Sequence, residues 1–246
     1  FHKNPIAYHQ SYSNQLFKLV RSEAIKLRLV KLGCGGETTR SFIKGVRHCP
    51  FPEGSQLAQA VKFLESNPGQ VEFITIDLGG NDIIGACLNF RTAALKLNCV
   101  KAVMPTIQAN LTTILQTLET AAPGVPIYGM TFYNPLLGLW VLGWGGGPGD
   151  PSLAQANAKS WAVFNAGLVA AYEANGVTVA DVAGAFAISD FSDLVPLKGA
   201  GMVPLNVAND CNWTWNCTTP PLGWDIHPNN KGYGVIAQAF ADVVTL

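Results

Sequence analysis

A short apolar run that ends at two glycines and an asparagine narrows the choice of fold for this chain more than any other segment does. Residues 71–77 are rich in β-branched and aromatic side chains. They are too short for a helix and predict a strand buried on both faces. Gly79-Gly80-Asn81-Asp82 ends the run, and ligands of open α/β sheets bind outside the carboxyl ends of the strands. The run therefore predicts a parallel sheet that presents Asn81 at its binding edge, with an ordinary strand-exit turn as the alternative.

Predicted strands and helices alternate along the rest of the chain. This alternation implies a parallel sheet with helices on both faces, and we expect one domain over residues 1–246. Further strands are predicted at 27–32, 125–132 and 177–182, and helices at 14–26, 56–66, 101–121, 151–175 and from about 234 to 244. Two segments without a strong period, 136–149 and 183–224, are predicted to be loops.

Composition excludes several classes of partner. The chain has 246 residues, of which 48% are hydrophobic, enough for one α/β domain with a sizeable core. Sixteen basic and sixteen acidic residues cancel, which argues against nucleic acid and against a polybasic membrane patch. No apolar run reaches the roughly 18 residues that span a bilayer, and the first residues do not resemble a signal peptide. We expect a mature, soluble monomer.

The six cysteines form three locally spaced pairs that each flank a loop. This arrangement favours disulfides over zinc ligation and indicates secretion into an oxidising compartment. Nearest-neighbour pairing is the first choice among fifteen connectivities, and free buried thiols are the alternative. No cluster of His, Cys and carboxylates has ligand spacing, so we expect no metal or other cofactor. The pairs are Cys34 with Cys49, Cys87 with Cys99, and Cys211 with Cys217.

Three polar loops together carry the groups that acyl transfer requires. They are residues 33–39, 79–82 and 225–228. A backbone glycine N–H and an asparagine amide can donate to a developing oxyanion, and a histidine suits the role of general base at neutral pH. His227 fits that role best. The other histidines, which lie in loops without comparable neighbours, are His2, His9 and His48.

This combination resembles the SGNH, or GDSL, hydrolase superfamily of esterases and lipases over essentially the whole chain. Residues 32–39 are similar to the second family block, 79–82 to the third and 225–227 to the fifth. The run 206–217 also resembles secreted bacterial members with three disulfides. The resemblance implies a three-layer α/β/α sandwich with a parallel, flavodoxin-like sheet in the order 2-1-3-4-5.

The resemblance also implies roles for single residues. The Gly36 N–H and the Asn81 side chain would be oxyanion donors, and His227 the general base. The family usually places its acid three residues before the histidine, a position held here by Trp224. Either Asp225, two residues before, orients His227, or the main-chain carbonyl of Trp224 does so and leaves a Ser-His dyad.

The nucleophile block of the family, Gly-Asp-Ser after strand 1, is not found in the sequence. In the family, strand 1 lies between the strands predicted here at 27–32 and 71–77. Without it, unpaired backbone groups would cost about 1–3 kcal/mol each. We therefore expect that a segment carrying strand 1 and the serine is missing from this chain. Three serines near the right blocks do not follow a strand in a tight turn and are poor substitutes: Ser11, Ser13 and Ser41.

The expected function is serine-dependent hydrolysis of a carboxylic ester through an acyl-enzyme. The substrate would be a small-molecule ester or a lipid, since family blocks report the reaction and not the acyl or alcohol group. Aromatic residues in 133–149 and 211–224 favour an apolar substrate. The alternative is a non-catalytic lipid- or carbohydrate-binding protein on the same fold.

Overall fold

A parallel sheet lies at the centre of the computed structural model, which describes residues 10–21, 26–218 and 225–246. Its three strands are ordered β1-β4-β5 and span Ile74–Thr75, Ile127–Met130 and Thr178–Ala180. Ile74 pairs with Ile127, and Tyr128 pairs with Thr178, both in parallel register. The predicted α/β class with a parallel sheet is therefore confirmed.

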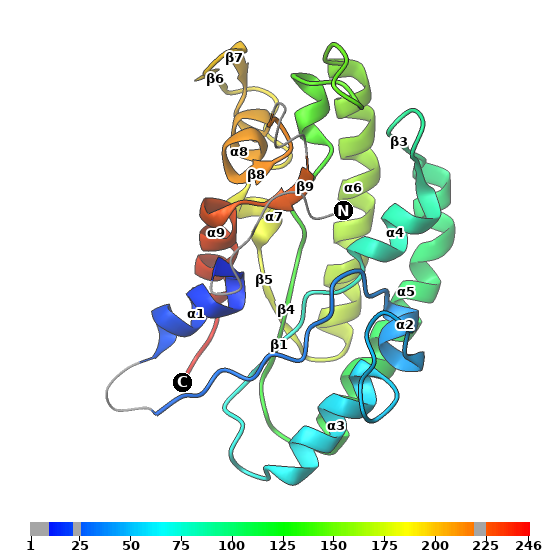
Figure 1. Ribbon diagram of the computed structural model, residues 1–246, viewed down its shortest axis with the longest axis vertical. Coiled ribbons are helices and arrows are strands. Elements are labelled where there is room, and N and C mark those ends of the chain that lie inside the picture. The colour runs from blue at the N-terminus through cyan, green and yellow to red at the C-terminus, as the bar shows by residue number, and fades with distance from the viewer. Residues whose placement is uncertain (1–9, 22–25, 219–224) are drawn as a thin grey trace.

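Helices cover both faces of this sheet and make three layers (Figure 1). The face with the larger core packs against α2 (Thr39–Lys44), α3 (Gln56–Ser66), α4 (Gly80–Cys87), α5 (Leu97–Ala121) and α6 (Pro151–Ala174). The other face packs against α1 (Tyr12–Val20), α7 (Val182–Ala185) and α9 (Asn230–Ala241). Burial of apolar side chains on both faces stabilises this sandwich. No helix within the described ranges is long and apolar enough to cross a membrane.

Local signals predicted several helices well. The predicted helix at 56–66 is α3, which begins after an N-cap in which the Ser55 side chain accepts from the Ala58 N–H. The predicted helix at 151–175 is α6, which begins with Pro151 in its first turn. The first helix is shorter than predicted, because α1 ends at Val20.

The sheet differs from the prediction on the β1 side. β4 is buried throughout, whereas both residues of β1 are only half-buried. The ladder covers two residues of the predicted 71–77, although the Ile76 N–H still donates to the Tyr128 carbonyl over 2.9 Å. Residues 27–32 belong to no strand of the described chain, so the predicted strand there is wrong. A strand needs a ladder partner, and β1 pairs only with β4 among the described residues.

Both predicted loops contain regular structure. The segment 183–218 contains the hairpin β6 (Leu194–Leu197) and β7 (Gly201–Pro204), then α8 (Leu205–Trp213) and β8 (Thr214–Trp215). The segment 136–149 begins with the turn η2 (Leu137–Trp140), whose first three residues are buried. These elements are short and are held by tertiary contacts, so their sequences show little period of their own. Another hairpin joins β2 (Leu88–Asn89) to β3 (Ala94–Leu95).

The disulfides follow the predicted nearest-neighbour pairing. Cys34 bonds to Cys49, Cys87 to Cys99, and Cys211 to Cys217, with Cα–Cα distances of 6.2, 5.5 and 5.0 Å. The first pair closes the segment that follows the glycine-rich loop. The third pair joins α8 to the residue that lies two positions beyond β8.

Candidate active site

The glycine loop, defined as residues 33–39, lies against the first turn of α4. Gly36 has a φ of 84°, a conformation that favours glycine because it has no Cβ. The side-chain nitrogen of Asn81 donates to the Glu37 carbonyl over 3.0 Å. An amide nitrogen carries two hydrogens, so a single contact leaves the second available to another acceptor. The structure thus brings together the two predicted oxyanion donors.

A second contact fixes the end of the same loop. The Asp82 carboxylate accepts from the Thr39 N–H over 2.9 Å and from its hydroxyl over 2.6 Å. Thr39 is fully buried, and the Asn110 side chain donates to its hydroxyl over 3.0 Å. Burial raises the pKa of Asp82, and the contacts with Thr39 oppose that shift. The predicted turn at 79–82 is therefore the start of a helix whose first polar residues hold the loop.

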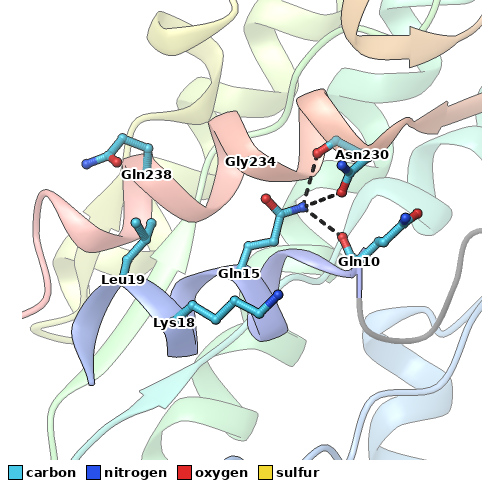
Figure 2. Close-up of a pocket in the computed structure, with 7 residues that line it drawn as sticks. All are labelled: Gln10, Gln15, Lys18, Leu19, Asn230, Gly234 and Gln238. Atoms are coloured by element: carbon cyan, nitrogen blue, oxygen red, sulfur yellow. Dashed lines mark hydrogen bonds between the residues drawn. The ribbon is translucent and has the colours of Figure 1, made fainter. Parts of the chain in front are cut away.

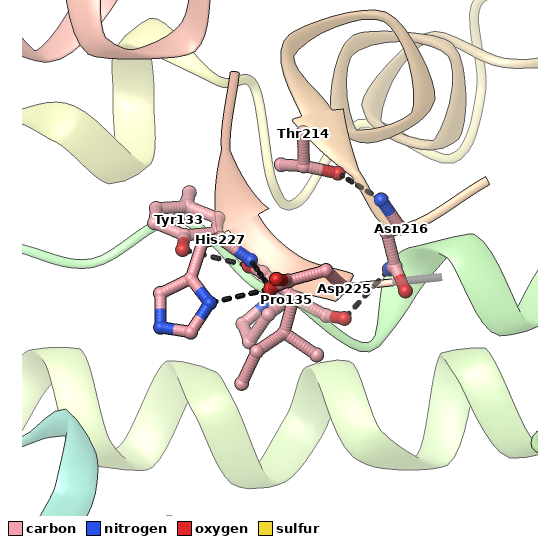
Figure 3. Close-up of polar contacts among 7 residues, drawn as sticks. Tyr133, Pro135, Thr214, Asn216, Asp225 and His227 are labelled. Carbon is pink, nitrogen blue, oxygen red and sulfur yellow. Dashed lines mark hydrogen bonds and ion pairs between the residues drawn. The ribbon is translucent and has the colours of Figure 1, made fainter. Parts of the chain in front are cut away.

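His227 and Asp225 lie on β9 (Asp225–Pro228) and contact each other directly (Figure 3). One oxygen of the Asp225 carboxylate accepts from the His227 backbone N–H over 2.9 Å and also contacts Nδ1 of the ring. The ring is 39% exposed and the Asp225 side chain 9%, so the imidazole is accessible while its partner is shielded. Asp225 is therefore in place to orient His227. Trp224, the alternative, lies outside the described residues.

β9 forms an antiparallel pair with β8, and several segments support this β8–β9 pair. Asn216 donates its amide to the Pro135 carbonyl over 2.7 Å and to Asp210 over 2.8 Å. Asp210 also accepts from the Gly138 N–H over 2.8 Å. Burial raises the pKa of Asp210 to about 7, although the contacts with Asn216 and Gly138 lower it. The segment after β4 is thus tied to the strand that pairs with β9.

Asp77 is a further carboxylate that interacts electrostatically with His227, and it is absent from the residues predicted from the sequence. It lies at the exit of β1, two residues before Gly79. Its side chain is exposed, yet the protein packed around it raises its pKa to about 6, and the charge of His227 opposes that rise. The available signal was a carboxylate inside a run predicted to be buried.

The serines considered from the sequence serve local structure. The Ser11 hydroxyl accepts from Lys31 Nζ over 2.8 Å and donates to Asn14 over 3.0 Å. The Ser13 hydroxyl lies 3.2 Å from that of Ser11. Ser41 takes part in the capping box of α2 and donates to the buried Glu37 carboxylate. These contacts give the three serines local structural roles, and the expectation that none of them is the nucleophile stays a prediction.

His48 lies in a loop, is exposed and contacts the glycine loop. Its Nε2 lies 3.1 Å from the Gly35 carbonyl oxygen. Cys34, His48 and Cys49 are the one group with metal-ligand spacing in the described chain, but the two sulfurs form a disulfide and cannot act as thiolate ligands. His2 and His9 lie outside the described residues.

An open groove of about 430 Å³ runs between α1 and α9 (Figure 2). Gln15 crosses it and donates to the Gln10 carbonyl, the Asn230 carbonyl and the Asn230 side chain over 2.9–3.1 Å. None of the residues that line it is a predicted site residue. The groove therefore marks the junction of α1 with the start of α9, shortly after His227.

Comparison with known proteins agrees with the chemistry of these loops. The model of the GDSL-like lipase/acylhydrolase family matches residues 4–235. That range contains the glycine loop, Asn81 and the β9 strand. Comparison with curated proteins gives no match.

Proposed function

The chain belongs to the GDSL-like lipase/acylhydrolase family, and from this membership we propose that it is a serine-dependent carboxylic-ester hydrolase working through an acyl-enzyme. The observation that carries the proposal is the direct contact between Asp225 and His227 on β9. Family membership supports hydrolase activity in general. The substrate, an ester or a lipid, belongs to the proposal.

The proposed mechanism gives each group one task. The serine oxygen attacks the ester carbonyl carbon while His227 accepts the hydroxyl proton, and Asp225 stabilises the imidazolium that forms. The Gly36 N–H and the Asn81 amide donate to the oxyanion. Collapse of the tetrahedral intermediate expels the alcohol, which takes the proton from His227. Water then repeats these steps on the acyl-enzyme and releases the acid.

We propose that the serine is carried by an additional strand on the free edge of β1. Two observations support this. β1 pairs only with β4 among the described residues, and β1 is half-buried where β4 is fully buried. An inserted strand would satisfy the backbone groups of that edge. Determining the N-terminal sequence and intact mass of the native protein tests this part.

Hydrolysis of a short-chain nitrophenyl ester by the native protein tests the activity. We expect turnover, and we expect His227→Ala to lower kcat by about 10²–10⁴, the range for loss of a general base. Lys62→Ala is the control, because Lys62 is exposed on α3, which contributes no residue to the proposed site. Absence of turnover in a protein shown to contain the serine strand would contradict the proposal and favour a lipid- or carbohydrate-binding role.

Three disulfides are consistent with an extracellular protein, and we propose that the chain is secreted. We also propose that it acts as a monomer on a small-molecule ester, without a cofactor. Size-exclusion chromatography with light scattering tests the oligomeric state. Activity that survives EDTA would agree with the absence of a metal requirement.

A further inference from the structure

The position of His227 depends on the backbone of β9. The Ile226 carbonyl lies between the two residues of the His227–Asp225 pair, and it accepts a hydrogen bond of 2.9 Å from the Tyr133 hydroxyl (Figure 3). Rotation of the peptide bonds around Ile226 would turn the two side chains relative to each other. A hydrogen bond to this carbonyl therefore restricts how the His227 and Asp225 side chains are oriented relative to each other.

Aromatic packing fixes the hydroxyl that makes this contact. Tyr133 follows β4, and its ring stacks on that of Phe186 with centroids 5.1 Å apart and an interplanar angle of 28°. Phe186 is buried and meets Trp213 edge-on at 5.1 Å. Offset-stacked and edge-to-face arrangements of this kind are favourable. The phenol is thus supported by the α7 and α8 regions and points at β9.

The Tyr133 hydroxyl keeps its proton and can therefore donate a hydrogen bond at all relevant pH values. Burial raises the pKa of Tyr133 well above its usual range, and Tyr233, Asp210, Asp77 and Asp225 raise it further. The hydroxyl therefore stays protonated over the pH range in which a histidine base operates. Its hydrogen bond to Ile226 does not depend on pH there.

We propose that Tyr133 is a positioning residue for the His227–Asp225 pair. Its hydroxyl holds the Ile226 carbonyl, so that the Asp225 carboxylate meets both the backbone N–H and Nδ1 of His227. Tyr133 is not a catalytic residue, because its hydroxyl donates its hydrogen bond to the Ile226 carbonyl of β9. The inference rests on the proposed function only for its effect on turnover. The effect on the geometry of the pair stands without it.

Tyr133→Phe tests the inference because it removes the hydroxyl and keeps the stacked ring. Tyr128→Phe is the matched control, since its hydroxyl lies 3.2 Å from that of Thr245 and not against β9. We expect the downfield NMR resonance of His227 Hδ1 to be present in the wild type and in the control. In Tyr133→Phe we expect this resonance to broaden through exchange with water. In the native esterase, kcat should fall about tenfold with KM within twofold, because small misplacements of a catalytic group are costly.

A second variant keeps the inference testable if Tyr133→Phe does not fold. Phe186→Leu keeps the hydroxyl and removes the ring on which Tyr133 stacks, so the same broadening is expected to a smaller degree. An unchanged Hδ1 resonance in folded Tyr133→Phe would overturn the inference. Equal kcat in active wild type and variant would overturn it as well. If the wild type hydrolyses no ester, the proposed function fails, and the NMR comparison alone decides the role of Tyr133.

Discussion

The glycine loop and the β8–β9 pair both present groups to the candidate site, yet they are anchored in different ways. The loop is held from the first turn of α4, where Asn81 and Asp82 reach Glu37 and Thr39. The β8–β9 pair is held by contacts from the segment after β4, from α8 and from the N-cap of α9. Substitutions of Asn81 and Asp82 therefore test how the loop is held, and substitution of Asp210 tests how the β8–β9 pair is held.

Asn81→Ala should give the largest effect and tests the loop side of this comparison. We expect kcat to fall by about 10²–10³, the usual cost of losing one oxyanion donor. Asn110→Ala is the control, because it removes an amide that contacts the same loop at Thr39 but has no proposed role in catalysis. A loss of tenfold or less in a normally folded Asn81→Ala protein would count against the donor role.

Asp210→Asn tests the anchoring of the β8–β9 pair through stability. The pKa of Asp210 is raised from 3.8 to about 7, so its contribution to stability is complete below about pH 4 and is lost as pH rises through 7. Asparagine keeps an oxygen acceptor and does not titrate. Between pH 4 and 8, the free energy of unfolding of the variant should therefore rise relative to wild type, by roughly 2–4 kcal/mol.

Chemical denaturation at the two pH values measures this difference. Asp190→Asn is the control, because hydrogen bonds from the Asp193 and Ser192 region lower the pKa of Asp190. Its contribution to stability is present above the unfolded pKa of about 4 and is lost only as pH falls through the lower folded pKa, so this variant should show little pH dependence relative to wild type between pH 4 and 8. Identical pH dependence in Asp210→Asn and wild type would mean that Asp210 does not anchor β8 as a buried acid.

Asp82→Ala should give the smallest of the three effects and separates anchoring from catalysis. It leaves the buried Thr39 N–H without its acceptor, which costs about 1–3 kcal/mol. Urea denaturation measures the loss, and Asp82→Asn, which keeps one oxygen, should lose less. If Asp82→Ala were as stable as wild type, the loop would be held by contacts other than those from α4.

Much of the fold and part of the site could be predicted from local sequence. The boundaries of α3 and α6 follow from capping residues and apolar period, and the disulfides join the nearest cysteines. The three polar loops indicated the family through residue types alone. Such signals depend on residues only a few positions apart, so they can be recognised in the sequence without knowledge of the fold.

The rest depends on contacts between distant segments. Tyr133 and Ile226 are 93 positions apart, and nothing near Tyr133 marks it as a support for β9. The hairpin β6–β7 and helix α8 were predicted to be loop because they gain stability mainly by packing on neighbours. The spacing of Asp225 two residues before the histidine does not predict where its side chain points, and the folded structure places its carboxylate at Nδ1 of His227.

Residue types and their order along the chain specify the chemical groups that this protein carries: the Gly36 loop, Asn81, and the Asp225–His227 pair. Which carboxylate meets His227 and which tyrosine holds β9 became clear from the folded structure alone. Residue type and spacing encode local conformation, whereas the relative placement of separate loops is set by the packing of the whole core.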